Sequence, residues 1–100
     1  MTAREQEITQ RVVEILRSTI SPSKIILFGS RAKGISYEGS DFDIAVDREA
    51  GGAAQEREIA EKIDEVAGLY KVDLVFLPNV DEGFRDIILK TGKVIYEGRN

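Results

Sequence analysis

The chain of 100 residues contains no cysteine and no histidine, and these two absences exclude several kinds of chemistry. Without cysteine there are no disulfide bonds, thiolate metal sites or cysteine nucleophiles. Without histidine there are no imidazole bases and no imidazole metal ligands. Any metal must therefore be bound through oxygen, which favours magnesium, manganese or calcium. Any acid–base step must use carboxylates, lysine or tyrosine.

Long apolar runs and an excess of positive charge are also missing. The longest uninterrupted apolar runs, residues 25–28 and 74–77, are four residues each. Neither approaches the length of a membrane span or a signal-peptide core, so we expect a soluble, cytoplasmic protein. The 14 basic and 18 acidic residues give a net charge of −4. This acidic balance argues against nucleic acid as a partner, because such proteins need a basic surface.

The length of 100 residues predicts a single domain over residues 1–100, and its pattern of helices and strands predicts the α+β (mixed α/β) class. Apolar residues at intervals of three and four predict helices over 3–20, 54–67 and 81–90. Short apolar or alternating stretches predict strands over 24–28, 41–47, 71–77 and 93–96. Thr2 and Glu5 have the spacing of a capping box at the start of the first helix.

Two aspartates stand at alternate positions where the second predicted strand begins, in the stretch S-D-F-D-I-A-V. Side chains two apart on a strand share a face roughly 6–7 Å apart, so Asp41 and Asp43 repel each other unless a cation lies between them. Asp73 interrupts the apolar strand 71–77 in the same way. If the two strands are neighbours, the three aspartates converge. Carboxylates of this kind, together with substrate phosphates, are the usual ligands of magnesium.

The turn before the loop has the residues of a phosphate site. Gly29 ends a strand and allows close approach of the backbone, and Ser30 adds a hydroxyl group. If a helical turn follows, its free N–H groups point at an anion. Arg31 and Lys33 add positive charge, and residues 31–40 join this turn to the aspartates. The stretch is not a P-loop, because Ile35 stands where that motif needs lysine.

Each of these features also has a purely structural explanation. Gly-Ser at the end of a strand is common in turns, and Ser40-Asp41 has the residues of a loop cap. Asp73 could be a surface residue at a strand end, and Arg31 and Lys33 could be solvated charges. It is the combination of a phosphate-type turn, a loop, alternating aspartates and a third strand aspartate that indicates a functional site.

The same residues resemble a known motif. They are similar to the pattern of the DNA-polymerase-beta-like nucleotidyltransferases. That pattern is matched here by Gly29-Ser30, ten intervening residues, Asp41-Phe42-Asp43, and then Asp73 in V-D-L-V-F. More narrowly, the chain resembles the minimal nucleotidyltransferase (MNT) domains of prokaryotes, from its first helix to the final I-Y-E-G. Lys33 stands where arginine is more common in that group.

The resemblance implies a fold, an activity and a set of roles. The fold would be a small mixed β-sheet with helices packed on one face. The activity would be magnesium-dependent transfer of AMP from ATP to an acceptor hydroxyl, with release of pyrophosphate. Asp41 and Asp43 would bind two magnesium ions, and Asp73 would bind the metal nearest the acceptor and help deprotonate it. The residues implied to bind the nucleotide are Gly29, Ser30, Arg31 and Lys33.

The resemblance also implies a partner. Minimal domains of this kind pair with a helical HEPN-type toxin, act as its antitoxin and adenylylate one of its tyrosines. Two alternatives remain open. The acceptor could instead be a small molecule or an RNA, although the acidic charge weighs against RNA. The chain could also be a non-catalytic antitoxin that neutralises its partner by contact, although the intact set of aspartates argues against this.

Overall fold

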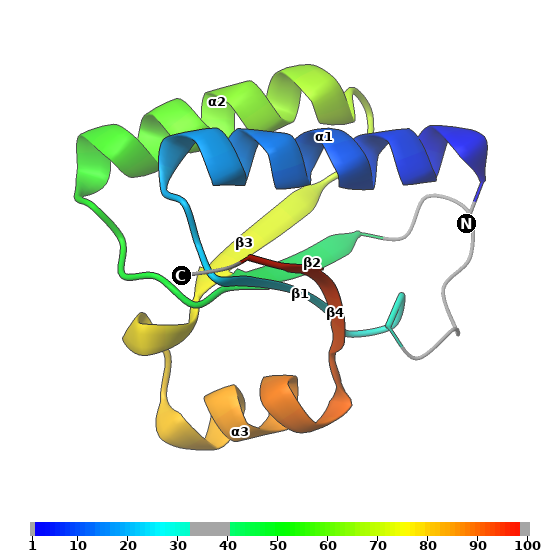
Figure 1. The fold of residues 1–100 in the computed structure, drawn as a ribbon. Coiled ribbons are helices and arrows are strands. Elements are labelled where there is room, and N and C mark those ends of the chain that lie inside the picture. Colours follow the sequence, from blue (N-terminus) through cyan, green and yellow to red (C-terminus); the bar gives the residue numbers. More distant parts are fainter. Residues whose placement is uncertain (1, 33–40, 99–100) are drawn as a thin grey trace.

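The structure is a computed structural model that describes residues 2–32 and 41–98. Its helices and strands follow the predicted order along the chain (Figure 1). The helices are α1 (Ala3–Thr19), α2 (Ala53–Ala67) and α3 (Glu82–Thr91), and a short 3₁₀ turn, η1, spans Leu77–Asn79. The strands are β1 (Lys24–Phe28), β2 (Phe42–Val46), β3 (Val72–Phe76) and β4 (Lys93–Glu97). The second strand is shorter than predicted and begins after Asp41.

The four strands form one mixed sheet in the order β3-β2-β1-β4. β1 runs antiparallel to both of its neighbours, whereas β2 and β3 are parallel. A parallel pair needs a long crossover, and α2 supplies it between β2 and β3. The sheet is therefore mixed, as the resemblance implied, and the fold belongs to the α+β class.

Two helices cover one face of the sheet. α1 and α2 lie side by side above the strands in Figure 1, and each sends an apolar stripe onto them. The stripes correspond to the intervals of three and four seen in the sequence. The main core under these helices consists of Ile8, Val12, Leu16, Ile25, Leu27, Phe42, Ile44, Val46, Ile59, Ile63 and Ala67.

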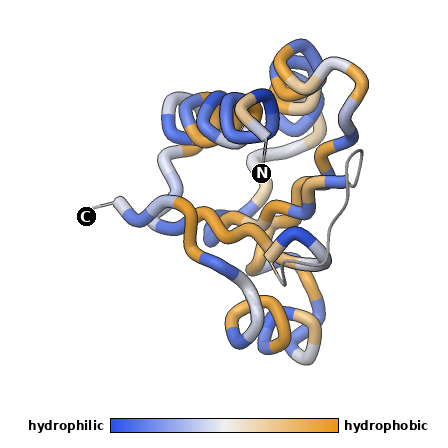
Figure 2. The backbone as a smooth tube through the Cα atoms, turned by 90° about the vertical axis from the view of Figure 1, so that its right-hand side faces the viewer, coloured by the Kyte–Doolittle hydropathy of each residue, from blue (hydrophilic) through white to orange (hydrophobic). Residues whose placement is uncertain are grey.

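The third helix lies on the opposite face, so the expectation that all helices pack on one face is wrong in this detail. Figure 1 shows α3 on the side of the sheet away from α1 and α2. Ile88 of α3 packs on Ile26, Phe28 and Ala45 in a second, smaller core. The cause is the sequence of β1, which is apolar at every position after Lys24 and must be covered on both faces. Figure 2 shows the hydrophobic colour concentrated along the strands between the two helical layers. None of the helices in the described residues is long and apolar enough to cross a membrane.

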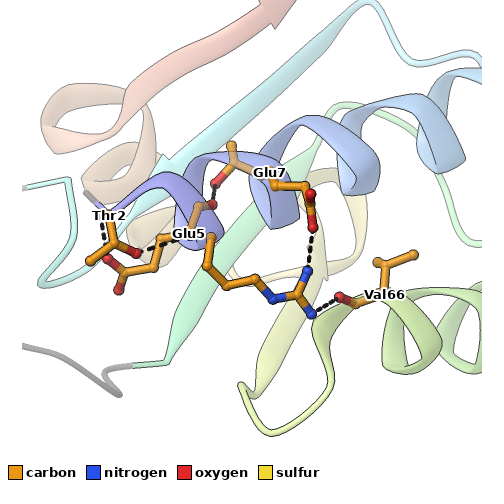
Figure 3. Close-up of polar contacts among 6 residues, drawn as sticks. Thr2, Glu5, Glu7 and Val66 are labelled. Carbon is orange, nitrogen blue, oxygen red and sulfur yellow. Dashed lines mark hydrogen bonds and ion pairs between the residues drawn. The ribbon is translucent and has the colours of Figure 1, made fainter.

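The N-terminus of α1 carries the predicted capping box (Figure 3). The backbone N–H of Glu5 donates to the Thr2 hydroxyl at 3.2 Å, and the Thr2 N–H donates to Glu5 Oε1 at 2.8 Å. One turn of the helix is therefore closed by its own side chains. Arg4 joins this end to the second helix by donating to the carbonyl oxygen of Val66 at 2.9 Å. The start of α1 is thus tied to α2.

Candidate active site

The turn after β1 brings the two halves of the sequence motif into contact. Gly29 has a φ of +74°, in the left-handed region that favours glycine. A Cβ atom at this position would lie 2.5 Å from Asp43 Oδ2 and 3.3 Å from Asp43 Cγ. The carboxylate of Asp43 therefore rests directly on the backbone of Gly29. Ser30 follows, half-buried, in a turn over residues 29–32, while the rest of the expected helical turn lies outside the described residues.

The strand register places Asp73 beside Asp43. The two residues are direct partners in the parallel pairing of β2 with β3, and neighbouring strands lie about 4.8 Å apart. Partners across a ladder point to the same face, and here it is the face that carries Ala45 and α3. Asp41 lies one residue before β2 and is exposed. The structure thus brings Asp43, Asp73 and Gly29 together and leaves Asp41 at the flank.

Repulsion between these carboxylates has an electrostatic consequence. Burial raises the pKa of Asp43, and the negative charges of Asp73 and Asp41 raise it further. Lys71 offsets part of this effect. Its ammonium group lies 3.7 Å from Asp73 Oδ1, but both side chains are exposed, at 69% and 44%, so the pair is weak. The protein itself therefore supplies too little positive charge beside Asp43 to balance the negative charges around it.

An oxygen-bound divalent cation fits the chemistry of this donor set. The donors are carboxylates only, and a cation would relieve the repulsion that raises the pKa of Asp43. Within the described residues, however, no group of three acidic side chains is arranged so that it could hold an ion. The observed arrangement is an adjoining pair, Asp43 and Asp73, with Asp41 close enough to act through its charge.

Arg31 has surroundings that the sequence did not indicate. The resemblance implies that Arg31 binds the nucleotide, and the alternative was a solvated charge; in the structure the residue is buried, with 7% of its surface exposed. Its guanidinium pairs with Glu5 of α1 at 2.7 Å, donates to the Asp41 carbonyl oxygen at 3.2 Å, and lies 4.0 Å above the ring of Phe42. The sequence did not predict the pairing of Glu5 with Arg31. The capping box gives a partner to one carboxylate oxygen of Glu5 and says nothing about the other. Lys33 and Ser40 lie outside the described residues.

Two hollows flank these residues. One, of about 350 Å³, opens beside β3 and α2 and is lined in part by Asp73, Asp64 and Arg57. Another, of about 530 Å³, lies beside α1, β1 and β4 and includes Leu27 and Arg31. Leu27 faces α1 and α2, opposite to the aspartates, so this larger hollow does not define the site. The smaller hollow is lined also by Ile63, Leu74 and Phe76, which belong to the core under α1 and α2, so it too lies mainly on the face opposite to the aspartates and does not define the site.

The environment of Glu5 predicts a pH-dependent stability. The bond from the Thr2 N–H and the bond from Arg31 lower the pKa of Glu5 from 4.5 to about 2. A carboxyl group whose pKa is lower in the folded state stabilises the fold above its unfolded pKa. That contribution is lost as the pH falls from 4.5 to about 2. We expect Glu5→Gln to lower the melting temperature at pH 7, and the difference from wild type to close by pH 2.

Thermal unfolding by circular dichroism across this pH range measures the difference. Glu7→Gln is the matched control, since Glu7 is 55% exposed and pairs with the exposed Arg4. Exposed ion pairs contribute about 0–1 kcal/mol, so this variant should follow wild type at every pH. If the melting temperature of Glu5→Gln stayed below that of wild type by a constant amount down to pH 2, the charge of Glu5 would contribute nothing to stability.

Comparison with solved structures identifies the fold. A toxin–antitoxin complex with AMP-PNP contains a chain that superposes with a TM-score of 0.75 at 27% identity, covering 90% of this chain and 73% of that one. The MNT antitoxin bound to the tri-AMPylated HEPN toxin of Shewanella oneidensis gives 0.70 at 24%, covering 95% and 73%. A minimal nucleotidyltransferase gives 0.67 at 22%, covering 92% and 95%. No curated protein sequence matches the chain.

The fold is that of the nucleotidyltransferases, and the sequence identifies the family. The model of the family described as "Polymerase beta, Nucleotidyltransferase" matches residues 10–100, which is nearly the whole chain. The chain therefore belongs to the polymerase beta nucleotidyltransferase family.

Proposed function

We propose that this protein transfers AMP from ATP to a tyrosine hydroxyl of a HEPN-type toxin, with magnesium, and thereby acts as the antitoxin in the cytoplasm. The observation that carries the proposal is the contact between Asp43 and Gly29, with Asp73 in register beside them. This joins a phosphate-type turn to a carboxylate pair in one place. The solved complexes of similar chains with HEPN toxins and with AMP-PNP support the partner and the nucleotide.

The roles follow from the positions of the residues. Gly29 and Ser30, at the end of β1, hold the triphosphate through the turn. Asp41 and Asp43 would hold magnesium, which when bound neutralises the carboxylates and the phosphates. Asp73 lies on the edge strand β3 with its side chain 44% exposed, so an acceptor can approach it from solvent. Lys33 would add positive charge for binding the nucleotide.

The reaction is an in-line displacement at the α-phosphorus of ATP. The acceptor oxygen forms a bond to this phosphorus, and the bond from the phosphorus to the oxygen bridging to the β-phosphate breaks. Pyrophosphate leaves with that oxygen. The hydroxyl proton passes to the carboxylate of Asp73 and then to water, so atoms and charge balance.

The test is transfer of label from α-labelled ATP to protein, with magnesium. The purified chain is assayed alone and with the protein encoded beside its gene, and γ-labelled ATP serves to exclude phosphorylation. We expect label on a tyrosine of the neighbour with α-labelled ATP only, and its loss in Asp73→Asn. Asp64→Asn is the matched control, because Asp64 is an exposed carboxylate on α2, which covers the opposite face of the sheet, and should leave transfer intact.

Three results would argue against the proposal in different ways. Label on a small molecule or an RNA instead of a protein would keep the enzyme and replace the acceptor. Neutralisation of the toxin by Asp41→Ala/Asp43→Ala/Asp73→Ala would indicate an antitoxin that acts by contact. No binding of ATP at all would reject nucleotidyl transfer.

A further inference from the structure

A buried ion pair lies directly behind the proposed active site. Arg31 and Glu5 are joined at 2.7 Å, and their side chains are only 2% and 5% exposed. Removing two charges from water is costly, so such a pair is weak evidence for stability by itself. A role in fixing geometry would account for its presence, and the contacts of Arg31 indicate which geometry is fixed.

Arg31 touches both halves of the site. Its backbone directly follows Gly29-Ser30, and its Nε donates at 3.2 Å to the carbonyl oxygen of Asp41. Its guanidinium also lies 4.0 Å above the ring of Phe42, the residue between the two aspartates. One side chain therefore ties the turn at the end of β1 to the start of β2.

Glu5 holds that side chain from a third element. Its Oε2 pairs with Arg31, while its Oε1 accepts from the Thr2 N–H at 2.8 Å. Glu5 is thus itself fixed at the capped N-terminus of α1. The result is a continuous set of contacts from α1, through Arg31, to the backbone at Asp41.

We propose that Arg31 is a positioning residue, braced by Glu5, which keeps the Gly29-Ser30 turn at a fixed place relative to the two aspartates. The inference rests on the proposed nucleotidyl transfer and adds a function for two residues behind the site. Because Asp43 lies against the backbone of Gly29, a shift of the turn displaces the reacting groups directly. Misplacement by about 1 Å can slow a reaction roughly 100-fold.

A substitution of Glu5 distinguishes a positioning role of Arg31 from a direct contact with a phosphate of the nucleotide, because the two roles predict different effects. If Arg31 bound the nucleotide, removing the charge of Glu5 would release the guanidinium, and ATP would bind equally well or more tightly. If Arg31 acts through its contacts with Glu5 and Asp41, the same change slows transfer. Glu5→Gln therefore separates the two roles by the sign of its effect.

The experiment measures kcat and KM for ATP in the full chain with its protein acceptor. We expect Glu5→Gln to reduce kcat by roughly ten- to a hundredfold with little change in KM, because Arg31 does not touch the nucleotide. Thr2→Val is the matched control, since it removes the hydroxyl cap of the same helix end and keeps the pair. It should lower the melting temperature and leave kcat unchanged.

Two further measurements keep the test decisive if a variant unfolds or if the wild-type protein shows no transfer. Glu5→Leu/Arg31→Met replaces the pair by apolar groups that keep the fold, yet it should also lose transfer because the bond to Asp41 is gone. Amide hydrogen exchange at Ser30 and Phe42 should rise about tenfold in Glu5→Gln but not in Thr2→Val. If wild type transfers nothing, the proposed function fails while the exchange data still decide on the brace. Unchanged kcat or unchanged exchange in Glu5→Gln would overturn it.

Discussion

Replacing Asp43 by asparagine is expected to abolish nucleotidyl transfer and, at the same time, to make the fold more stable at neutral pH. Removal of one charged group that stabilises a transition state typically costs about 100- to 1,000-fold in rate, and we expect a loss of at least this size. Stability should rise because burial and the neighbouring Asp73 and Asp41 raise the pKa of Asp43. The neutral amide of asparagine has a similar shape and is not repelled by the charges of Asp73 and Asp41.

The sign of the pH dependence follows from the same shift. A carboxyl group with a raised pKa in the folded state destabilises the fold when it is ionised in both states. The penalty is therefore present at pH 7 and disappears as the pH falls below the ordinary pKa of the group, 3.8. The higher melting temperature of Asp43→Asn should accordingly shrink toward that of wild type in acid.

Asp47→Asn is the matched control for this prediction, because Asp47 follows the same strand and has the opposite environment. Burial alone would raise the pKa of Asp47, but bonds from the Ser23 hydroxyl and from the N–H groups of Lys24 and Ser23 lower it overall. The Lys24 N–H lies 2.9 Å from Asp47 Oδ1. Asp47→Asn should therefore reduce stability and preserve transfer.

The pair of variants is measured by thermal unfolding and by transfer of AMP from labelled ATP. The same chemical change, at two ends of one strand, should give opposite effects on stability and on activity. Transfer by Asp43→Asn at more than a tenth of the wild-type rate would remove Asp43 from the active site. A lower melting temperature for Asp43→Asn would instead show that its charge is compensated.

Local sequence patterns predicted the order of elements, because spacing of apolar residues is a local property. The mixed sheet was implied only by the resemblance to the nucleotidyltransferases. They did not predict on which face each helix lies. The strand β1 is apolar on both faces, so helices are needed on both, but nothing in the spacing assigns α3 to the face of Ile26 and Phe28. That choice depends on how the whole chain packs.

The candidate site, like the fold, was predicted only in part. Aspartates that interrupt two apolar strands indicated that Asp43 and Asp73 would meet, and the register pairs them. The alternation also suggested that Asp41 belongs to the strand, whereas its carbonyl oxygen accepts a bond from Arg31 just before β2 begins. The partner of Arg31, Glu5, is distant in sequence, and no local pattern connects a helix cap with a turn in the sheet.

Replacing Gly29 by alanine is expected to reduce both stability and activity, for two separable reasons. The left-handed backbone, with φ at +74°, costs a residue with a Cβ atom about 1–2 kcal/mol. The new atom would also lie 2.5 Å from Asp43 Oδ2, so the carboxylate must move. Transfer should therefore fall even where the protein remains folded.

Gly83→Ala is the matched control, since Gly83 lies within α3 and its added Cβ would meet Asp81 Oδ2 at an ordinary 3.5 Å. Alanine is favoured over glycine inside a helix by roughly 0.5–1 kcal/mol, so this variant should gain stability. Urea unfolding measures both changes, and the assay with labelled ATP measures transfer.

A double-mutant cycle separates the two reasons for the loss in Gly29→Ala. Asp43→Ala removes the carboxylate oxygens and Cγ, and leaves a Cβ that is 3.6 Å away, an ordinary contact. Gly29→Ala should therefore cost less in the Asp43→Ala background, where only the backbone strain remains. Equal costs in both backgrounds would mean that the turn and the aspartate do not touch. Because residues in contact couple and distant ones do not, the cycle reports the geometry of the site without requiring that it be active.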